Sequence, residues 1–209
     1  MSQANTMKQR GRRIAALLAG ITMIVAVLCC ATLLYNYKYH KIVITPIGRE
    51  VYFTTERNPD AKTCVPAAYT DCDNKILGSY RIDGRTYNKT HFPHKMSLTA
   101  SGLVISRSWH SANGFQQQTL VYRGKAYHFR DPARRLRRAL CSNGDQEYYI
   151  IESTYPMTLC EFANICSKNS YYAANLDMGT YGYGKVNGHI RNWWTIFWRG
   201  KQTNWICAE

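Results

Sequence analysis

The chain of 209 residues is marked by what it lacks. It has no Cys-x-x-Cys pair, so a zinc site is not expected, and we predict neither a metal nor another cofactor. It has no internal repeat or low-complexity tract. Its length fits one domain of ordinary size, large enough to bury a hydrophobic core. Acidic residues are scarce, 13 against 27 Lys and Arg, and the net charge of +14 favours anionic partners.

Charged residues are also absent from 14–35, a stretch long enough to span a bilayer. The preceding residues 1–13 carry basic but no acidic side chains, so the positive-inside rule keeps them in the cytoplasm. We therefore predict a transmembrane signal anchor over 14–35, a linker over 36–50 and an extracytoplasmic domain over 51–209. This domain would lie in the periplasm or outside the cell, attached to the inner membrane.

A cleaved signal peptide is the alternative to an anchor. No Ala-x-Ala cleavage site follows the apolar stretch, which favours the anchor. A lipoprotein is not indicated either, because the residues before Cys29 and Cys30 are not the small residue that lipidation requires.

Short β-rich runs separated by turns fill residues 51–129. Hairpin turns are predicted at Asp83-Gly84, Arg123-Gly124 and Asn143-Gly144. Only one helix has a strong signal. The predicted fold class is therefore α+β, a mainly antiparallel sheet with few helices on one side, preceded by one N-terminal transmembrane helix.

That helix follows Pro156. Thr158 and Glu161 have the spacing of a capping box, and Asn169 is suited to end the helix in a left-handed conformation. A helical period places four apolar residues on one face that must be buried: Leu159, Phe162, Ala163 and Cys166.

A short apolar and aromatic run, residues 171–176, predicts a buried strand that ends at Asp177. The loop after Asp177 contains Gly179, Gly182 and Gly184, which let a ligand approach the backbone closely. A carboxylate in that position is a candidate site residue; the other reading is a turn aspartate that caps loop amides.

The segment 157–188 resembles the C-terminal motif of the phosphodiester glycosidase family, through its capped helix, its Asn175-Leu176-Asp177 turn and its downstream Asn187-Gly188. Weaker similarity extends upstream to four segments: Arg137–Cys141, Tyr148–Ser153, Phe115–Gly124 and Cys64–Asp71. The resemblance implies a hydrolase that cleaves a sugar from a glycosyl phosphodiester; with the predicted anchor, this hydrolase would be membrane-anchored and extracytoplasmic.

Two departures support an alternative. Pro66-Ala67-Ala68 stands where the family has Asn-Gly-Gly, and Met178-Gly179-Thr180 stands where it has three glycines. A catalytically inactive relative that binds an anionic glycan or an envelope partner is therefore the second hypothesis. A structural partner within a membrane assembly is the third.

Glycoside cleavage through an oxocarbenium-like transition state uses carboxylates, and Asp177 is the first candidate, with Glu152 as the second. Arg137 is predicted to bind phosphate through its planar guanidinium, and Asn175 to orient sugar hydroxyls. Three further residues complete the predicted substrate site: Gly179, Gln116 and His110.

Basic and aromatic residues outside that site have two readings each. Arg130, Arg134 and Arg135 form an anion site or a solvated face. The aromatic segment 193–198 forms a strand with a buried face or a platform for sugars. Nucleic acid is not expected as a partner, because the domain is predicted to lie outside the cytoplasm.

Six cysteines lie beyond the apolar stretch and permit up to three disulfides. Cys64 and Cys72 flank a predicted turn and are a reasonable pair. Cys160, near the helix N-terminus, is a structural thiol or a reactive one.

Overall fold

The structure, a computed structural model, describes residues 15, 17–31, 41–178, 183–191 and 202–209. The chain divides into two compact units, Met1–His40 and Lys41–Glu209. In the first unit, residues 17–31 are helical. Among the described residues, no helix is both long and apolar enough to cross a membrane. The predicted tail over 1–13 and both ends of the predicted anchor lie outside the described residues.

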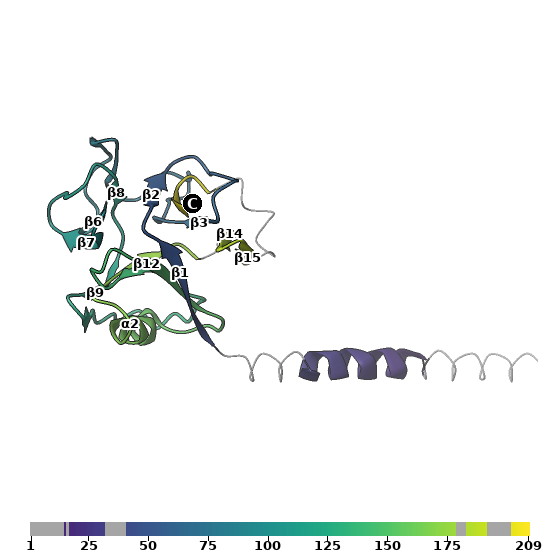
Figure 1. The fold of residues 1–209 in the computed structure, drawn as a ribbon. Coiled ribbons are helices and arrows are strands. Elements are labelled where there is room, and N and C mark those ends of the chain that lie inside the picture. The colour runs from purple at the N-terminus through teal and green to yellow at the C-terminus, as the bar shows by residue number, and fades with distance from the viewer. Residues whose placement is uncertain (1–14, 16, 32–40, 179–182, 192–201) are drawn as a thin grey trace, which may run out of the picture. The chain divides into compact units, whose positions relative to one another are not determined.

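The described part of the second unit contains antiparallel sheets and one α-helix, α2 (Leu159–Ser167), which confirms the mainly antiparallel α+β prediction (Figure 1). The largest sheet has six strands in the order β1-β12-β11-β13-β9-β10. Its strands are β1 (Ile42–Gly48), β9 (Thr119–Tyr122), β10 (Lys125–Ala126), β11 (Arg138–Ser142), β12 (Tyr148–Ser153) and β13 (Tyr172–Leu176).

Two five-stranded sheets complete the unit, in the orders β15-β14-β3-β16-β2 and β5-β4-β8-β6-β7. The first contains β2 (Val51–Thr54), β3 (Thr63–Pro66), β14 (Gly184–Val186), β15 (His189–Arg191) and β16 (Trp205–Ala208). The second contains β4 (Tyr80–Ile82), β5 (Arg85–Tyr87), β6 (Lys95–Thr99), β7 (Gly102–Ser106) and β8 (Gly114–Phe115).

Strand β1 corrects the predicted linker over 36–50. It pairs with β12 along its length, from Ile42 opposite Ser153 to Gly48 opposite Tyr148. The ladder satisfies the backbone groups that face β12, which a free linker would leave to water. The folded unit therefore begins at Lys41, earlier than predicted.

Two cores lie on the two faces of the six-stranded sheet, as the alternation along β11 illustrates. Ala139 and Cys141 pack with Phe162 and Cys166 of α2 on one face. Leu140 points to the other face, where the core contains buried residues from all three sheets. Figure 1 shows α2 on one side of the six-stranded sheet and the other two sheets on the opposite side.

The three predicted hairpin turns are confirmed, at β4–β5, β9–β10 and β11–β12. At the β9–β10 turn, Arg123 and Gly124 have φ of 51° and 74°, the left-handed pair that a two-residue hairpin requires. These turns fix the register of each hairpin.

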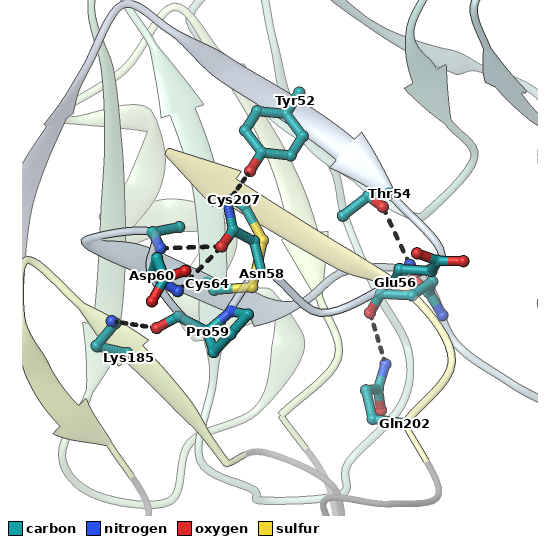
Figure 2. The surroundings of a disulfide bond; sticks show 12 residues. Tyr52, Thr54, Glu56, Asn58, Pro59, Asp60, Cys64, Lys185, Gln202 and Cys207 are labelled. Atoms are coloured by element: carbon teal, nitrogen blue, oxygen red, sulfur yellow. Dashed lines mark hydrogen bonds between the residues drawn. A yellow bond between two sulfur atoms is a disulfide. The ribbon is translucent and has the colours of Figure 1, made fainter. Parts of the chain in front are cut away.

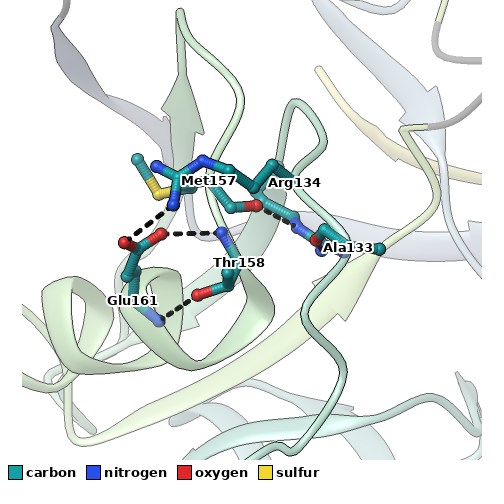
Figure 3. Close-up of polar contacts among 6 residues, drawn as sticks. Ala133, Arg134, Met157, Thr158 and Glu161 are labelled. Carbon is teal, nitrogen blue, oxygen red and sulfur yellow. Dashed lines mark hydrogen bonds and ion pairs between the residues drawn. The ribbon is translucent and has the colours of Figure 1, made fainter.

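Helix α2 begins as predicted. Thr158 accepts a hydrogen bond from the Glu161 amide at 3.1 Å, and Glu161 accepts one from the Thr158 amide at 2.8 Å (Figure 3). The four apolar residues predicted for its inner face are all buried. The C-terminus differs from the prediction, because Lys168 caps the helix in a right-handed conformation and Asn169 is not left-handed.

The predicted Cys64–Cys72 pair is wrong. Cys64 forms a disulfide with Cys207, whose Cα atom is 4.1 Å away on the neighbouring strand β16 (Figure 2). Cys72 lies in an exposed turn as a free thiol. The pairing of β3 with β16, which involves residues 143 positions apart, brings the two sulfur atoms together.

Candidate functional site

A small cavity lies where β11 begins and β13 ends. Arg138 pairs with Leu176 at the last rung of this ladder, so the residues just beyond it, Arg137 and Asp177, meet at the same edge of the sheet. The cavity has a volume of about 40 Å³ and is lined by Tyr69, Arg135, Leu136, Arg137, Asn175, Leu176, Asp177 and Met178. Three residues that the sequence analysis selected, Arg137, Asn175 and Asp177, are therefore together.

Arg137 is a buried cation held by backbone carbonyls. Its Nε donates to Met157 O at 3.1 Å and its Nη2 donates to Ala133 O at 2.7 Å. None of the ion pairs among the described residues involves Arg137. Burial, followed by repulsion from Arg135, lowers the pKa of this guanidinium. A buried charge with such neighbours favours an anionic ligand.

Tyr69 and Asn175 are bonded to each other at the cavity. Asn175 Nδ2 donates to the Tyr69 hydroxyl at 2.5 Å, and that hydroxyl donates to Gln118 Oε1 at 3.3 Å. Asn175 Oδ1 is buried and has no hydrogen-bond partner among the described residues. An unpartnered buried acceptor of this kind is costly unless a ligand or a water supplies a donor.

Asp177 is only 8% exposed, and its amide donates to Ala67 O at 2.9 Å. This bond joins the end of β13 to the segment after β3. Burial raises the pKa of the Tyr69 hydroxyl, the charge of Asp177 raises it further, and Arg137 opposes both. Tyr69 is thus a protonated donor at neutral pH, within the electrostatic reach of both charged residues.

Glu152 is not in this cavity. Arg138 Nε and Nη2 lie 2.9 and 2.8 Å from Glu152 Oε1. Arg191 Nε lies 3.0 Å from Glu152 Oε2; this second contact is an ion pair but not a hydrogen bond. Both carboxylate oxygens are therefore engaged by guanidinium groups, and Glu152 lines a neighbouring cavity. A reaction at the first cavity would have to use Asp177 without it.

A second cavity, of about 160 Å³, adjoins the first. It is lined by Val43, Leu136, Glu152, Ser153, Thr154, Met178 and Arg191. Leu136 and Met178 line both cavities, so a ligand that extends from one to the other would pass these two side chains.

Two predicted substrate residues do not line either cavity. The buried Gln116 accepts from the amides of Ser79 and His91 and donates to Phe92 O, so its side chain braces a loop. His110 is exposed, and its amide donates to Ser97 Oγ. Gly179 and the aromatic segment 193–198 lie outside the described residues. In the described part of the chain, no group of three His, Cys, Asp or Glu could hold a metal ion.

Three residues were not predicted from the sequence to lie in this region: Tyr69 and Arg135, which line the first cavity, and Arg138, which pairs with Glu152. A charged Arg138 inside an apolar strand, next to a strand that carries Glu152, was a signal for a buried pair. Tyr69 offered no such signal, because its position depends on the path of the chain after β3.

The comparisons with known proteins give a fold and no family. No protein-family model matches the sequence, and no curated protein matches it. The solved structure of the zebrafish N-acetylglucosamine-1-phosphodiester alpha-N-acetylglucosaminidase catalytic domain, auto-inhibited by pro-peptide, has a TM-score of 0.60 and 14% identity, and covers 81% of this chain and 82% of that chain. A hypothetical protein from Synechocystis has a TM-score of 0.48 and 11% identity, and covers 79% of this chain and 56% of that chain. This chain therefore has a fold similar to that of the zebrafish domain.

Proposed function

We propose that this chain is a hydrolase that cleaves a sugar from a glycosyl phosphodiester. The observation that carries the proposal is the shared cavity of Arg137, Asn175 and Asp177, in a fold similar to a phosphodiester glycosidase domain. Arg137 supplies a buried positive charge, Asn175 an unpartnered acceptor and Asp177 a carboxylate.

The phosphate is the group that fits the smaller cavity. A volume of about 40 Å³ holds one or a few water molecules, too little for a sugar ring. We assign the phosphate to the Nη1 side of the Arg137 guanidinium, because Nε and Nη2 already donate to backbone carbonyls, and the sugar to the adjoining 160 Å³ cavity.

In this scheme the bond between the anomeric carbon and the phosphate oxygen breaks, and water supplies the new hydroxyl of the sugar. Asp177 stabilises the oxocarbenium-like transition state, and Arg137 stabilises the negative charge on the departing phosphomonoester. Asn175 Oδ1 accepts a hydrogen bond from a sugar hydroxyl, and the Tyr69 hydroxyl holds the Asn175 amide in position.

The test is hydrolysis of glycosyl phosphodiesters, beginning with an α-linked N-acetylglucosamine phosphodiester, by the fragment Lys41–Glu209. We expect Asp177→Asn and Arg137→Lys each to reduce kcat by about a hundredfold or more. Arg134→Ala is the matched control, because Arg134 is an exposed arginine that pairs with Glu161 and does not line the cavity (Figure 3). Equal rates in wild type and all three variants would refute the assignment.

A binding module that retains an anionic glycan is the second candidate. The segment Pro66-Ala67-Ala68 is buried and contributes no polar side chain, which favours this reading. No turnover across a panel of sugars, together with glycan binding that is lost in Arg137→Lys, would support binding over catalysis.

We also propose that the domain works outside the cytoplasm, anchored through residues 14–35. The Cys64–Cys207 disulfide is consistent with an oxidising compartment. Digestion by a protease added to spheroplasts, in which the inner membrane is intact, should remove the domain. Protection of the domain until that membrane is broken would contradict this location.

A further inference from the structure

An aromatic surface lies at the opposite end of strand β13 from Asp177. Tyr171 immediately precedes this strand and Tyr172 is its first residue. Tyr122 lies opposite Tyr172 on the neighbouring strand β9. At about 3.3 Å per residue, Tyr172 is roughly 16 Å from Asp177 along the strand. The aromatic surface is therefore separate from the cavity described above.

Rings from three segments of the chain build this surface. Tyr122 stacks on His94 with centroids 5.8 Å apart and lies 5.8 Å from Tyr172. His94 also meets Tyr127 edge-on at 5.9 Å, and Tyr171 meets Tyr172 edge-on at 4.9 Å. The guanidinium of Arg123 also lies over the Tyr122 ring, 5.2 Å from its centroid. Tyr127 and Tyr171, which are 37% and 44% exposed, are the rings that remain open to a ligand.

The backbone holds these rings in place. Gly124 of the β9–β10 turn donates its amide to Tyr171 O at 2.9 Å, and Tyr127 donates its amide to Leu120 O at 2.8 Å. The left-handed Arg123-Gly124 turn thus ties the hairpin to the start of β13. A surface that is already ordered loses little entropy when it binds a ligand.

A pocket of about 320 Å³ adjoins Tyr127 and is also lined by Tyr122, Lys125, Ala126 and His128. This volume is about twice that of the 160 Å³ cavity assigned to a sugar above, so a ring of sugar size fits. Lys125 and Arg123 are exposed cations on the same hairpin. Burial, and then the nearby Arg107, lower the pKa of His94, so the ring that supports Tyr122 is uncharged at neutral pH.

We propose that Tyr127 and Tyr171, with Arg123 and Lys125, form a second binding site for a glycan that carries negative charges. The exposed rings would stack on sugar faces, and the cations would attract the acidic groups. The disulfide favours a glycan over nucleic acid, because disulfides persist in compartments where nucleic acid is scarce. The site does not depend on hydrolysis at Asp177, and it would raise the local concentration of a polymeric substrate.

The test is calorimetric titration of the full-length protein, in a neutral detergent, with polygalacturonate oligomers. Tyr127→Ala and Tyr171→Ala should each weaken binding about threefold to tenfold. Tyr87→Ala, which removes a tyrosine that is 41% exposed on another sheet, should have no effect. Arg123→Ala should reduce the dependence of affinity on salt.

Comparison probes separate stacking from charge. Polyphosphate should bind equally to wild type and to the two tyrosine variants, and dextran should bind weakly to all of them. Asp177→Asn should bind the oligomers as wild type does, even if it has lost hydrolysis, which separates this site from the proposed activity. Equal binding by Tyr127→Ala, Tyr171→Ala and Tyr87→Ala would overturn the proposal. So would tighter binding of a single-stranded oligonucleotide that the same tyrosine variants abolish.

Discussion

Arg138 and Glu152 face each other across β11 and β12, and two nitrogen atoms of the buried guanidinium lie within 3.0 Å of Glu152 Oε1. Removing one partner of a buried pair leaves an uncompensated charge, which costs about 3–5 kcal/mol. We therefore expect Glu152→Ala to lower the free energy of unfolding by about that amount in urea denaturation. The double variant Arg138→Met/Glu152→Leu should recover much of the loss. Arg134→Ala, at an exposed pair, should cost less than about 1 kcal/mol.

The Cys64–Cys207 disulfide closes a loop of 143 residues. The chain-entropy model predicts about 5 kcal/mol of stabilisation for a loop of this length. Thermal denaturation should show that Cys64→Ala/Cys207→Ala unfolds at a much lower temperature than wild type, under non-reducing conditions. Cys72→Ser, at the exposed free thiol, should unfold at the same temperature as wild type. A lower unfolding temperature for Cys72→Ser than for Cys64→Ala/Cys207→Ala would indicate that Cys72 forms a disulfide.

The capping box predicts a local effect on α2. Thr158→Ala removes the acceptor for the Glu161 amide and should cost about 1 kcal/mol. The amide of Thr158 and then Arg134 lower the pKa of Glu161 below its usual 4.5. The contribution of this carboxylate is therefore present above pH 4.5 and disappears as the pH falls through the lower folded value. Between pH 6 and 3, the free energy of unfolding of Glu161→Gln should therefore fall less steeply than that of wild type.

Tyr148 predicts a loss of stability in alkali. Its buried hydroxyl donates to Thr99 O at 2.9 Å, and burial raises its pKa from 10.0 to about 12. Between these values the unfolded chain loses the proton while the folded protein keeps it, so stability falls as pH rises. The loss should reach about 2–3 kcal/mol by pH 12. Tyr148→Phe should remove this part of the pH dependence, whereas the exposed Tyr87→Phe should not.

Tyr69 is expected to matter for activity more than for folding. Tyr69→Phe removes the hydroxyl that bonds Asn175 and should reduce kcat/KM for a glycosyl phosphodiester about tenfold to a hundredfold. The midpoint of thermal unfolding should move little, because the ring remains. Since burial raises the pKa of Tyr69, activity should show no loss from its ionisation below pH 10. A kcat/KM for Tyr69→Phe equal to that of wild type would show that the Tyr69 hydroxyl has no role in the reaction.

Local patterns in the sequence determined the elements and several turns of this protein. The capping box of α2, the strand that ends at Leu176 and the Arg123-Gly124 hairpin all depend on residues a few positions apart, where short-range hydrogen bonds and backbone preferences dominate. Asp177 was selected because it ends a predicted strand, and Arg137 and Asn175 because the segments around them resemble the phosphodiester glycosidase family.

Only the tertiary structure decided which of these residues meet. The pairing of β11 with β13 and the crossing of the chain after β3 bring Tyr69 to Asn175, and the pairing of β3 with β16 joins Cys64 to Cys207. Gln116 and Glu152 are residue types that often bind substrates. In the structure, however, the Gln116 side chain accepts hydrogen bonds from backbone amides, and the Glu152 carboxylate pairs with Arg138 and Arg191. Contacts over 100 residues or more depend on how whole sheets stack, and no short pattern in the sequence contains that information.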